Sequence, residues 1–472
     1  MVGSDAGAGG EVTAAARPTD ALAAASRHRI LIVTLDMLTD RMAGPAIRAW
    51  EIATLLASEQ DVRLVTFGVA ERVCEAFRTE HIEVDDMRSV VDWSDVVIVQ
   101  GFVVATFPWF QTIDRVLIVD LYDPFHLESL EVEKYKSPER RDAALAFALR
   151  ELQAQTARGD LFLCASGRQR DLWIGHLAAV GRINPLTYDA DPTLDSLIRV
   201  VPFGMPDTPP VQQRHGIKGA IPGIAMDDKI ILWGGGVYNW FDPLTLVRAV
   251  DRLRGRVPTV RLYFLGMKHP NPDVPEMRIA SETRSLSDSL GLTDTHVFFN
   301  EDWVRYEQRA DYLLDADLGV SCHYPYVETA FSFRTRILDY LWAGLPIVCT
   351  AGDSFAELVE REELGRVVPA EDVDALVDAL EHVLVSDKDR RRYVENVARV
   401  APQFEWSRAM EPLVAFCRAP RRSADSARVG EQVLGANLAR RLWWDVVTAV
   451  RHLRAGGPRH LLTKIRLRLA RF

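Results

Sequence analysis

The sequence predicts an α/β protein with two doubly wound domains that face each other across a cleft. Its 472 residues exceed what one hydrophobic core usually holds, so two domains are expected. Short apolar runs alternate with helical patterns twice along the chain, which indicates parallel sheets covered on both faces. A stretch rich in proline and glycine, residues 206–224, separates the two series and reads as the linker.

The first series has predicted helices at 45–58 and 142–156 and predicted strands at 30–35, 63–67, 96–100, 116–120, 161–165 and 198–202. The second has predicted helices at 242–253 and 372–384 and predicted strands at 230–233, 261–265, 296–299, 318–321, 346–349 and 366–368.

Helix 242–253 shows how neighbouring residues specify an element. Asp242 can cap its first turn, and Pro243 fits the first helical position. Leu246, Val250 and Leu253 then form one apolar face.

Composition excludes several classes of protein. The five cysteines are scattered, with no CxxC pair and no Cys/His cluster, so neither a disulfide framework nor a zinc site is indicated. Residues 1–27 are rich in Ala, Gly, Ser and Asp and predict a disordered tail rather than a signal peptide. No apolar run is long enough to span a membrane, and a reducing cytoplasm fits the free thiols.

The charge is distributed unevenly. Residues 440–472 contain nine Lys or Arg and one acidic residue, Asp445, giving +8; since the total is −10, the remainder carries −18. An acidic body argues against nucleic-acid binding. The basic tail alternates apolar and basic side chains and includes Trp443 and Trp444, which suits an anionic membrane surface. Packing of this tail against the body is the alternative.

The most informative segment is 328–348, ETAFSFRTRILDYLWAGLPIV. A polar, aromatic and arginine-rich turn, which includes Ser332, Phe333 and Arg334, leads into an apolar helix. Backbone N–H groups at a helix start lack partners within the helix and can hold an anion. Asp339 follows further along the helix and can accept a hydrogen bond from a sugar hydroxyl. The segment therefore predicts a site for a phosphate joined to a sugar, whereas an ordinary helix with solvated arginines is the alternative.

Three further motifs lie at predicted strand ends. Gly44 and Pro45 open a helix that carries Arg48, and Gly234–Gly236 follow the first strand of the second series, where glycine allows a ligand to approach the backbone closely. The segment 120–126, DLYDPFH, places two carboxylates and the imidazole of His126 at the cleft, which suits a base or acceptor-binding role. Plain turns and a buried polar cap are the alternatives.

Other motifs are absent or ambiguous. No G-x-G-x-x-G with a following acidic residue and no P-loop occurs, which disfavours a dinucleotide dehydrogenase and excludes a P-loop ATPase. Asp315 and Asp317 form a D-x-D sequence, but it lies at a helix-to-strand junction, where we expect a capping role. No metal site is therefore predicted.

Together these pieces resemble GT-B glycosyltransferases of the large retaining family 4, over roughly residues 29–418. The helix AGPAIRAWEIATLLA is similar to the family's first-domain glycine turn and helix, and VVPFGMP resembles the strand and turn before its linker. DYLWAGLPIV looks like the family's E-A-x-A-x-G-x-P-V-V segment. Phe404-Glu405-Trp406 resembles the start of the last helix, which crosses back onto the first domain.

The chain departs from this family in its donor motif. The second glutamate of the family's pair falls on Asp339, but the first falls on Phe331, so we expect Glu328 to substitute for it. The family's Arg and Lys after the first strand of the second domain fall on Gly236 and Phe241. The predicted replacements for these cations are Arg334, Arg336 and Lys268.

The resemblance implies two Rossmann-like domains with the following division. Residues 1–27 are the N-terminal tail, 28–205 the acceptor domain, 206–224 the linker, 225–400 the nucleotide-sugar donor domain, 401–420 the helix crossing back, and 421–472 the basic amphipathic tail.

The implied activity is retaining transfer of a sugar from a nucleotide-sugar donor to a cell-envelope, polysaccharide or lipid-linked acceptor, without a metal or other cofactor, in the cytoplasm at the inner face of the membrane. A non-catalytic GT-B subunit that binds a nucleotide or sugar and a GT-B sugar-nucleotide epimerase are the alternatives.

The resemblance also assigns roles to residues. Asp339 would hold the ribose, and Gly235, Gly236 and the turn 332–334 would approach the donor phosphates together with the arginine side chains. The residues expected to line the acceptor side and the donor sugar are Gly44, Arg48 and His126.

Overall fold

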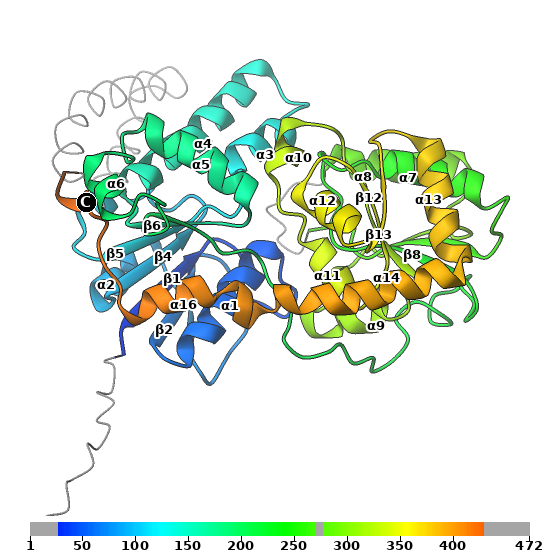
Figure 1. Ribbon diagram of the computed structural model, residues 1–472, viewed down its shortest axis with the longest axis horizontal. Helices are drawn as coiled ribbons and strands as arrows, with labels where there is room; N and C mark the ends of the chain where they lie inside the picture. Colours follow the sequence, from blue (N-terminus) through cyan, green and yellow to red (C-terminus); the bar gives the residue numbers. More distant parts are fainter. Residues whose placement is uncertain (1–26, 270–276, 429–472) are drawn as a thin grey trace, which may run out of the picture.

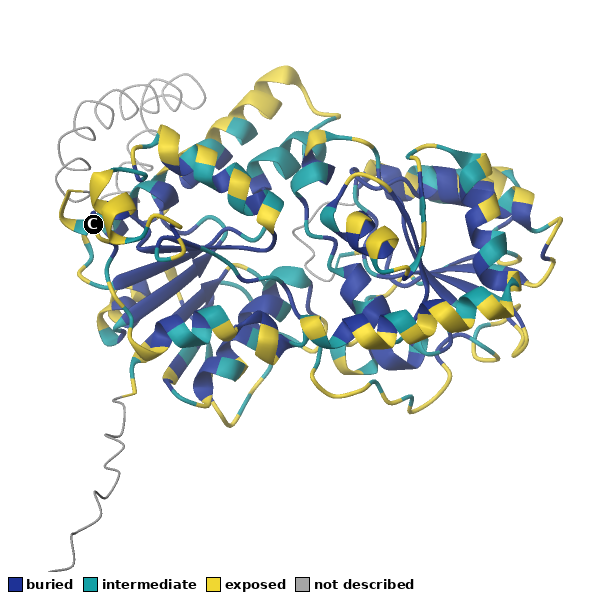
Figure 2. Cartoon of the chain, viewed as in Figure 1, coloured by how far each residue is buried: buried dark blue, intermediate teal, exposed yellow. Residues whose placement is uncertain are grey.

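The computed structural model describes residues 27–269 and 277–428, which form two domains side by side (Figure 1). Each domain is a parallel sheet with helices on both faces, and this confirms the predicted fold class. Buried residues fill the sheets and the helix faces that cover them, as Figure 2 shows. The predicted tail 1–27 lies outside the described residues except for Arg27, and so does all of 440–472. Among the described helices, none combines the length and apolarity that crossing a bilayer requires.

The sheet of the first domain has the strand order β3-β2-β1-β4-β5-β6-β7, with every neighbouring pair parallel. Its strands are β1 (Arg29–Thr34), β2 (Asp61–Thr66), β3 (Arg78–His81), β4 (Val96–Gln100), β5 (Val116–Asp120), β6 (Leu161–Cys164) and β7 (Ile198–Val200). Its helices are α1 (Gly44–Ala57), η1 (Val84–Asp86), α2 (Met87–Trp93), η2 (Pro108–Thr112), α3 (Phe125–Val132), α4 (Pro138–Arg158), α5 (Gly167–Ala179) and α6 (Pro185–Ala190).

The sheet of the second domain has the order β10-β9-β8-β11-β12-β13 and is also parallel. Its strands are β8 (Lys229–Trp233), β9 (Val260–Phe264), β10 (Val297–Phe299), β11 (Leu318–Ser321), β12 (Ile347–Thr350) and β13 (Gly365–Val368). Its helices are α7 (Pro243–Leu253), α8 (Arg278–Ser289), η3 (Tyr306–Gln308), α9 (Arg309–Leu313), α10 (Val327–Phe331), α11 (Arg336–Trp342), α12 (Ser354–Arg361), α13 (Val373–Val385) and α14 (Asp387–Val400).

The local signals in the sequence act as expected. The side chain of Asp242 accepts a hydrogen bond from the N–H of Thr245 at 2.9 Å, and Pro243 opens α7. Strands β4, β5 and β11 have the predicted bounds. Helix α4 is longer than predicted, because the side chain of Ser137 caps it by accepting from Arg140. Strand β3 was not predicted, since its sequence, RTEH, has no apolar run.

The linker is held to the second domain by the aspartates of the D-x-D sequence. Asp315 accepts hydrogen bonds from Gln212, from His215 and from the N–H groups of Ile217 and Lys218. The side chain of Asp317 accepts from Lys218 and from the N–H of Ile230 at 2.9 Å. These carboxylates therefore serve to attach the linker.

The chain crosses between the domains a second time after η4 (Ala401–Phe404), and α15 (Trp406–Ala409) and α16 (Glu411–Arg418) follow. The N–H of Met205, on the first crossing, donates to the carbonyl oxygen of Phe404 at 2.7 Å, and the N–H of Trp406 donates to Met205 at 2.9 Å. The two crossings thus run side by side, and α16 packs on α1 of the first domain.

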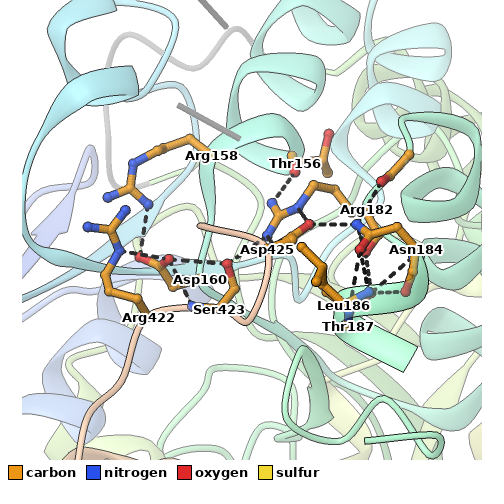
Figure 3. A network of polar contacts seen from close by, with 11 residues as sticks. Thr156, Arg158, Asp160, Arg182, Asn184, Leu186, Thr187, Arg422, Ser423 and Asp425 are labelled. Carbon is orange, nitrogen blue, oxygen red and sulfur yellow. Dashed lines mark hydrogen bonds and ion pairs between the residues drawn. The ribbon is translucent and has the colours of Figure 1, made fainter. Parts of the chain in front are cut away.

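Beyond α16 the chain is fixed to the first domain by a buried polar network (Figure 3). Arg182 forms a bidentate pair with Asp425 at 2.9 and 3.0 Å, and their side chains are only 3% and 1% exposed. Asp160, immediately before β6, accepts from Arg158, Arg422 and the N–H of Ser423. We refer to residues 420–428 as the C-terminal strap.

Candidate functional site

The turn after β8 lies against α11. Gly235 has φ +79°, a conformation that favours glycine, and no atom lies within 4 Å of where its Cβ would be. The N–H of Gly234 donates to the hydroxyl oxygen of Tyr340 at 2.8 Å. The predicted glycine turn therefore has an open backbone at Gly235 and is held from behind by α11.

Arg336, the first residue of α11, is a buried cation next to this turn. One of its nitrogens, Nη2, donates to the carbonyl oxygen of Gly236 at 2.8 Å, and its guanidinium stacks 3.9 Å from the ring centre of Phe241 and 4.4 Å from that of Trp233. Within the described part of the chain it forms no ion pair with a carboxylate, and Nη1 is buried without a hydrogen-bond partner. Burial lowers the pKa of Arg336 to about 10, so it stays charged at neutral pH.

Glu328 is not available to substitute for the missing glutamate, which corrects the expectation from sequence. It is 1% exposed, and its carboxylate is bound bidentately by Arg334, with distances of 3.1 and 2.8 Å, and by the hydroxyl of Ser332. These bonds instead shape the turn that follows α10. Arg334 keeps one buried nitrogen, Nε, without a hydrogen bond.

The predicted phosphate turn lies between the two domains. The ring of Phe333 stacks on Phe203 of the first domain, at a centroid distance of 6.3 Å, and packs 4.7 Å from Phe355 of the second. Among the described residues, the backbone N–H groups of Phe333 and Arg334 donate no hydrogen bond. Neither N–H group therefore has a partner within the described structure.

Asp339 lies on α11 at the edge of the site. Its Oδ1 accepts from Nε of Arg309 at 3.0 Å, and its side chain is 34% exposed, so part of the carboxylate faces solvent. Arg309 is itself stacked on Tyr306 and Trp342. The arrangement orients the carboxylate and leaves it accessible to a hydroxyl.

Arg48 does not line the acceptor side, in contrast to the expectation from sequence. It is fully buried and forms a bidentate pair with Asp120 at 2.7 and 2.9 Å. It also donates to the carbonyl oxygens of Val201 and Pro202 at 2.8 and 2.9 Å. Arg48 thus joins α1, β5 and the segment after β7. Gly44 opens α1, with Phe203 3.9 Å from where its Cβ would be.

His126, at the start of α3, contacts the ring of Trp173 at a centroid distance of 5.6 Å, and its Nδ1 is buried without a hydrogen-bond partner. Burial, and secondarily His176, lowers the pKa of His126 to about 4. The imidazole is therefore neutral at physiological pH and can accept or donate a hydrogen bond.

Two carboxylates of the first domain flank His126 in sequence. Burial, reinforced by Asp120, raises the pKa of Asp123 to about 7. Burial, reinforced by Asp123 and by Glu328 of the second domain, raises the pKa of Glu128 well above its usual range. Glu128 lies on α3, which packs against α10 of the second domain, so the two domains meet here. Glu128 was not predicted from sequence.

Lys268 is the least engaged of the predicted cations. It is 67% exposed, and within the described part of the chain its one ion pair is with Glu301 at 3.9 Å.

Two further hydrogen bonds join the domains around the site. The indole N–H of Trp303 donates to the carbonyl oxygen of Met42 at 3.1 Å, and Asn239 donates to that of Glu131 at 3.0 Å.

Comparison with known proteins finds a family match in the second domain. Residues 228–386 match the family model described as "Glycosyl transferases group 1". The matched residues lie within the second domain, which we call the group 1 domain. This group 1 domain contains the glycine turn, Arg334, Arg336 and Asp339.

Two curated relatives share shorter segments with the chain. It is 37% identical over 76 residues to a phosphatidyl-myo-inositol mannosyltransferase of Mycobacterium leprae, covering 16% of this chain and 20% of that protein. It is 28% identical over 107 residues to the protein of the same name from Mycolicibacterium smegmatis, covering 23% of this chain and 24% of that protein. The chain thus aligns with about a quarter or less of the length of these relatives.

Solved structures share the architecture across both domains. Sucrose-phosphate synthase from Thermosynechococcus elongatus superimposes with a TM-score of 0.61 at 15% identity, covering 83% of this chain and 98% of that one. Anabaena HepE in complex with UDP and glucose gives 0.58 at 14% identity, covering 83% and 100%. The fold is therefore GT-B, and the group 1 domain is its second half.

Proposed function

We propose that this protein is a retaining glycosyltransferase that moves a sugar from a nucleoside-diphosphate donor to a glycan or lipid-linked acceptor. The observation that carries the proposal is Arg336, a cation that is buried beside an open glycine turn and has no carboxylate partner among the described residues. Burying a charge without a counter-charge is costly, so such a group is expected where a ligand supplies the opposite charge. A diphosphate does so.

The neighbouring groups fit the rest of the donor. The free N–H groups of Phe333 and Arg334 suit phosphate oxygens, and the accessible carboxylate of Asp339 suits a ribose hydroxyl. The relative HepE is described in complex with UDP and glucose, which supports a nucleotide-sugar donor. The names of the curated relatives support a lipid-linked acceptor.

In the proposed reaction, the acceptor oxygen bonds to the anomeric carbon on the face from which the diphosphate leaves. The bond from that carbon to the diphosphate oxygen breaks, and the leaving oxygen takes the acceptor's proton. The protein contributes by orienting both substrates and by stabilising the negative charge that develops on the diphosphate. Neutral His126 would hold a sugar or acceptor hydroxyl without adding charge, and no step needs a metal.

The test is a thermal-shift screen of the full-length protein with uridine, guanosine, cytidine and deoxythymidine diphosphates, followed by transfer and hydrolysis assays with the corresponding nucleotide sugars. At least one diphosphate should raise the melting temperature of the wild-type protein, because a ligand that binds the native state stabilises it. Binding without transfer or hydrolysis would identify a non-catalytic subunit instead. Conversion of the donor to an isomeric nucleotide sugar would identify an epimerase.

A further inference from the structure

Helix α10 belongs to the second domain in sequence but packs on the first. Its most extensive helix contacts are with α3 and α5, which lie across the domain boundary (Figure 1). The backbone immediately after α10 is the turn proposed to hold the diphosphate. The surroundings of that turn are therefore shared between the two domains.

Gln169, in the first turn of α5, bonds directly to the end of α10. It is fully buried; its Oε1 accepts from the N–H of Ala165 at 2.7 Å, and its Nε2 donates to the carbonyl oxygens of Tyr122 at 2.7 Å and Phe331 at 2.8 Å. The N–H of Ala165 requires an oxygen and the two carbonyls require a donor, which fixes the orientation of the amide. One side chain thus ties the ends of β5 and β6 to the end of α10.

Arg168 makes a second connection. Its Nη1 donates to the carbonyl oxygen of Gly352 at 2.6 Å and lies 3.5 Å from that of Ala330, and its Nη2 pairs with Glu357. All three partners belong to the second domain. By contrast, Arg170 on the same helix bonds to the carbonyl of Thr193 and to Asp195, within the first domain.

We propose that Arg168 and Gln169 are positioning residues, which give the diphosphate-binding turn its shape only while the two domains are in contact. The inference rests on the proposed function of that turn. The last carbonyl groups of a helix have no partner within it, and a helix as short as α10, with five residues, is not stable alone. Here the carbonyls of Ala330 and Phe331 receive their donors from the first domain.

It follows that the donor site is complete only in the closed arrangement of the domains. A donor that binds the completed turn must then favour closure by the same free energy by which closure favours its binding. Loss of the two side chains should weaken donor binding and shift the ligand-free protein toward a more open arrangement, while the transferring groups remain in place.

The test uses full-length Arg168→Ala and the double variant Arg168→Ala/Gln169→Met, with Arg170→Ala as the matched control. We expect the Michaelis constant for the donor to rise at least about fivefold in Arg168→Ala and further in the double variant, with the turnover number changed less than about twofold. Arg168→Lys should recover part of the loss, and Arg170→Ala should match the wild type. An unchanged Michaelis constant in the double variant would overturn the proposal.

Small-angle scattering of the ligand-free protein tests, independently of activity, whether Arg168 and Gln169 hold the two domains together. The radius of gyration should be larger in the double variant than in the wild type and in Arg170→Ala, and melting curves would exclude unfolding as the cause. Equal radii would overturn the proposal even if donor binding changed. If the wild-type protein bound no nucleotide sugar, the proposed function would fail, whereas the scattering comparison would still decide whether these residues hold the domains together.

Discussion

The hydroxyl oxygen of Tyr340 lies 2.8 Å from the backbone nitrogen of Gly234, and this contact joins α11 to the glycine turn after β8. The helix can lie this close to the sheet because β11 carries Gly319, where a Cβ would come within 2.3 Å of the Tyr340 ring. Arg336 stands one turn before Tyr340 on the same helix. Within the described structure, the position of its cation is thus set by helix packing and not by an ion pair.

Arg336→Met should slow the reaction without destabilising the protein. The substitution removes a buried charge that no carboxylate offsets in the described structure, so we expect an unchanged or higher melting temperature in the absence of ligand. The turnover number should fall at least about tenfold, which corresponds to roughly 1.4 kcal/mol of barrier. Steady-state kinetics beside a melting curve measures both effects, and full activity would contradict the assigned role.

Arg334→Met is the contrasting variant. It leaves Glu328 buried without its partner and should lower the free energy of unfolding by about 3–5 kcal/mol. Adding Glu328→Gln should restore much of that loss, because the uncompensated carboxylate is then gone. A stable Arg334→Met single variant would show that the pair is not what shapes the turn.

Asp339→Ala should weaken donor binding while the fold remains intact. A ribose hydroxyl that loses its acceptor should cost about 1–3 kcal/mol of binding free energy. The Michaelis constant for the donor should rise accordingly. Because the change also frees Arg309 from its 3.0 Å ion pair, Asp339→Asn serves as a companion that keeps the side-chain volume. An unchanged Michaelis constant in both variants would count against the ribose assignment.

The stability of the protein should depend on pH with opposite signs at two neighbouring groups. His126, with a pKa of about 4 in the native state, stays neutral where the unfolded chain takes up a proton below about 6.5, so it makes stability rise with pH between these values. Asp123, with a native pKa of about 7, holds its proton where the unfolded chain loses it above about 3.8, so it makes stability fall as pH rises through that window.

Denaturant unfolding between pH 4 and 7 would separate the two groups. Relative to the wild type, His126→Gln should gain stability toward the acidic end, and Asp123→Asn should gain it toward the neutral end. Parallel curves for wild type and both variants would show that neither group is perturbed as the structure indicates.

Arg182→Ala should detach the C-terminal strap. Removing one partner of a buried ion pair leaves Asp425 uncompensated, and the free energy of unfolding should fall by about 3–5 kcal/mol. Arg418→Ala is the control, since the side chains of its pair with Glu59 are 53% and 38% exposed, and an exposed ion pair contributes far less to stability than a buried one. Calorimetry of both variants is the measurement. If the two substitutions lowered the free energy of unfolding equally, the pair between Arg182 and Asp425 would not be what holds the C-terminal strap.

Residues 440–472, which lie outside the described residues, are expected to bind an anionic membrane surface. Removing this +8 segment should release the protein from anionic vesicles without abolishing transfer to a soluble acceptor, because each basic residue near such a surface contributes about 1 kcal/mol. High salt should mimic the truncation. Vesicle sedimentation at low and high salt is the test, and full-length protein that stays in the supernatant at low salt would refute membrane binding. A lower melting temperature after truncation would indicate packing on the body.

The sequence predicted the architecture well because each strand and cap depends on residues close together in the chain. The buried apolar run of β5 and the capping of α7 by Asp242 are visible in a few consecutive residues. Arg336 could be singled out for the same reason, since it follows an aromatic and polar turn and opens a helix.

The site itself depends on contacts between residues that are far apart in the chain, and the sequence alone does not reveal which of them are in contact. Arg48 bonds to Asp120, Val201 and Pro202, which are far away in the chain. It could therefore not be predicted from the sequence that these partners occupy its guanidinium. Arg168 and Gln169 follow a predicted strand end, but a polar helix start usually faces solvent. Only the three-dimensional structure shows that the second domain covers the start of α5.

Strand β3 has a consequence for the behaviour of the protein at high concentration. It forms one edge of the first sheet, and its four residues, from Arg78 to His81, include a basic side chain and an acidic one, Glu80. Edge strands expose unpaired backbone groups that can recruit the edge of another molecule, and charged side chains discourage this. The polar residues that made β3 hard to predict from the sequence thus also protect the protein against aggregation. Apolar substitutions on this edge should make concentrated solutions of the protein turbid.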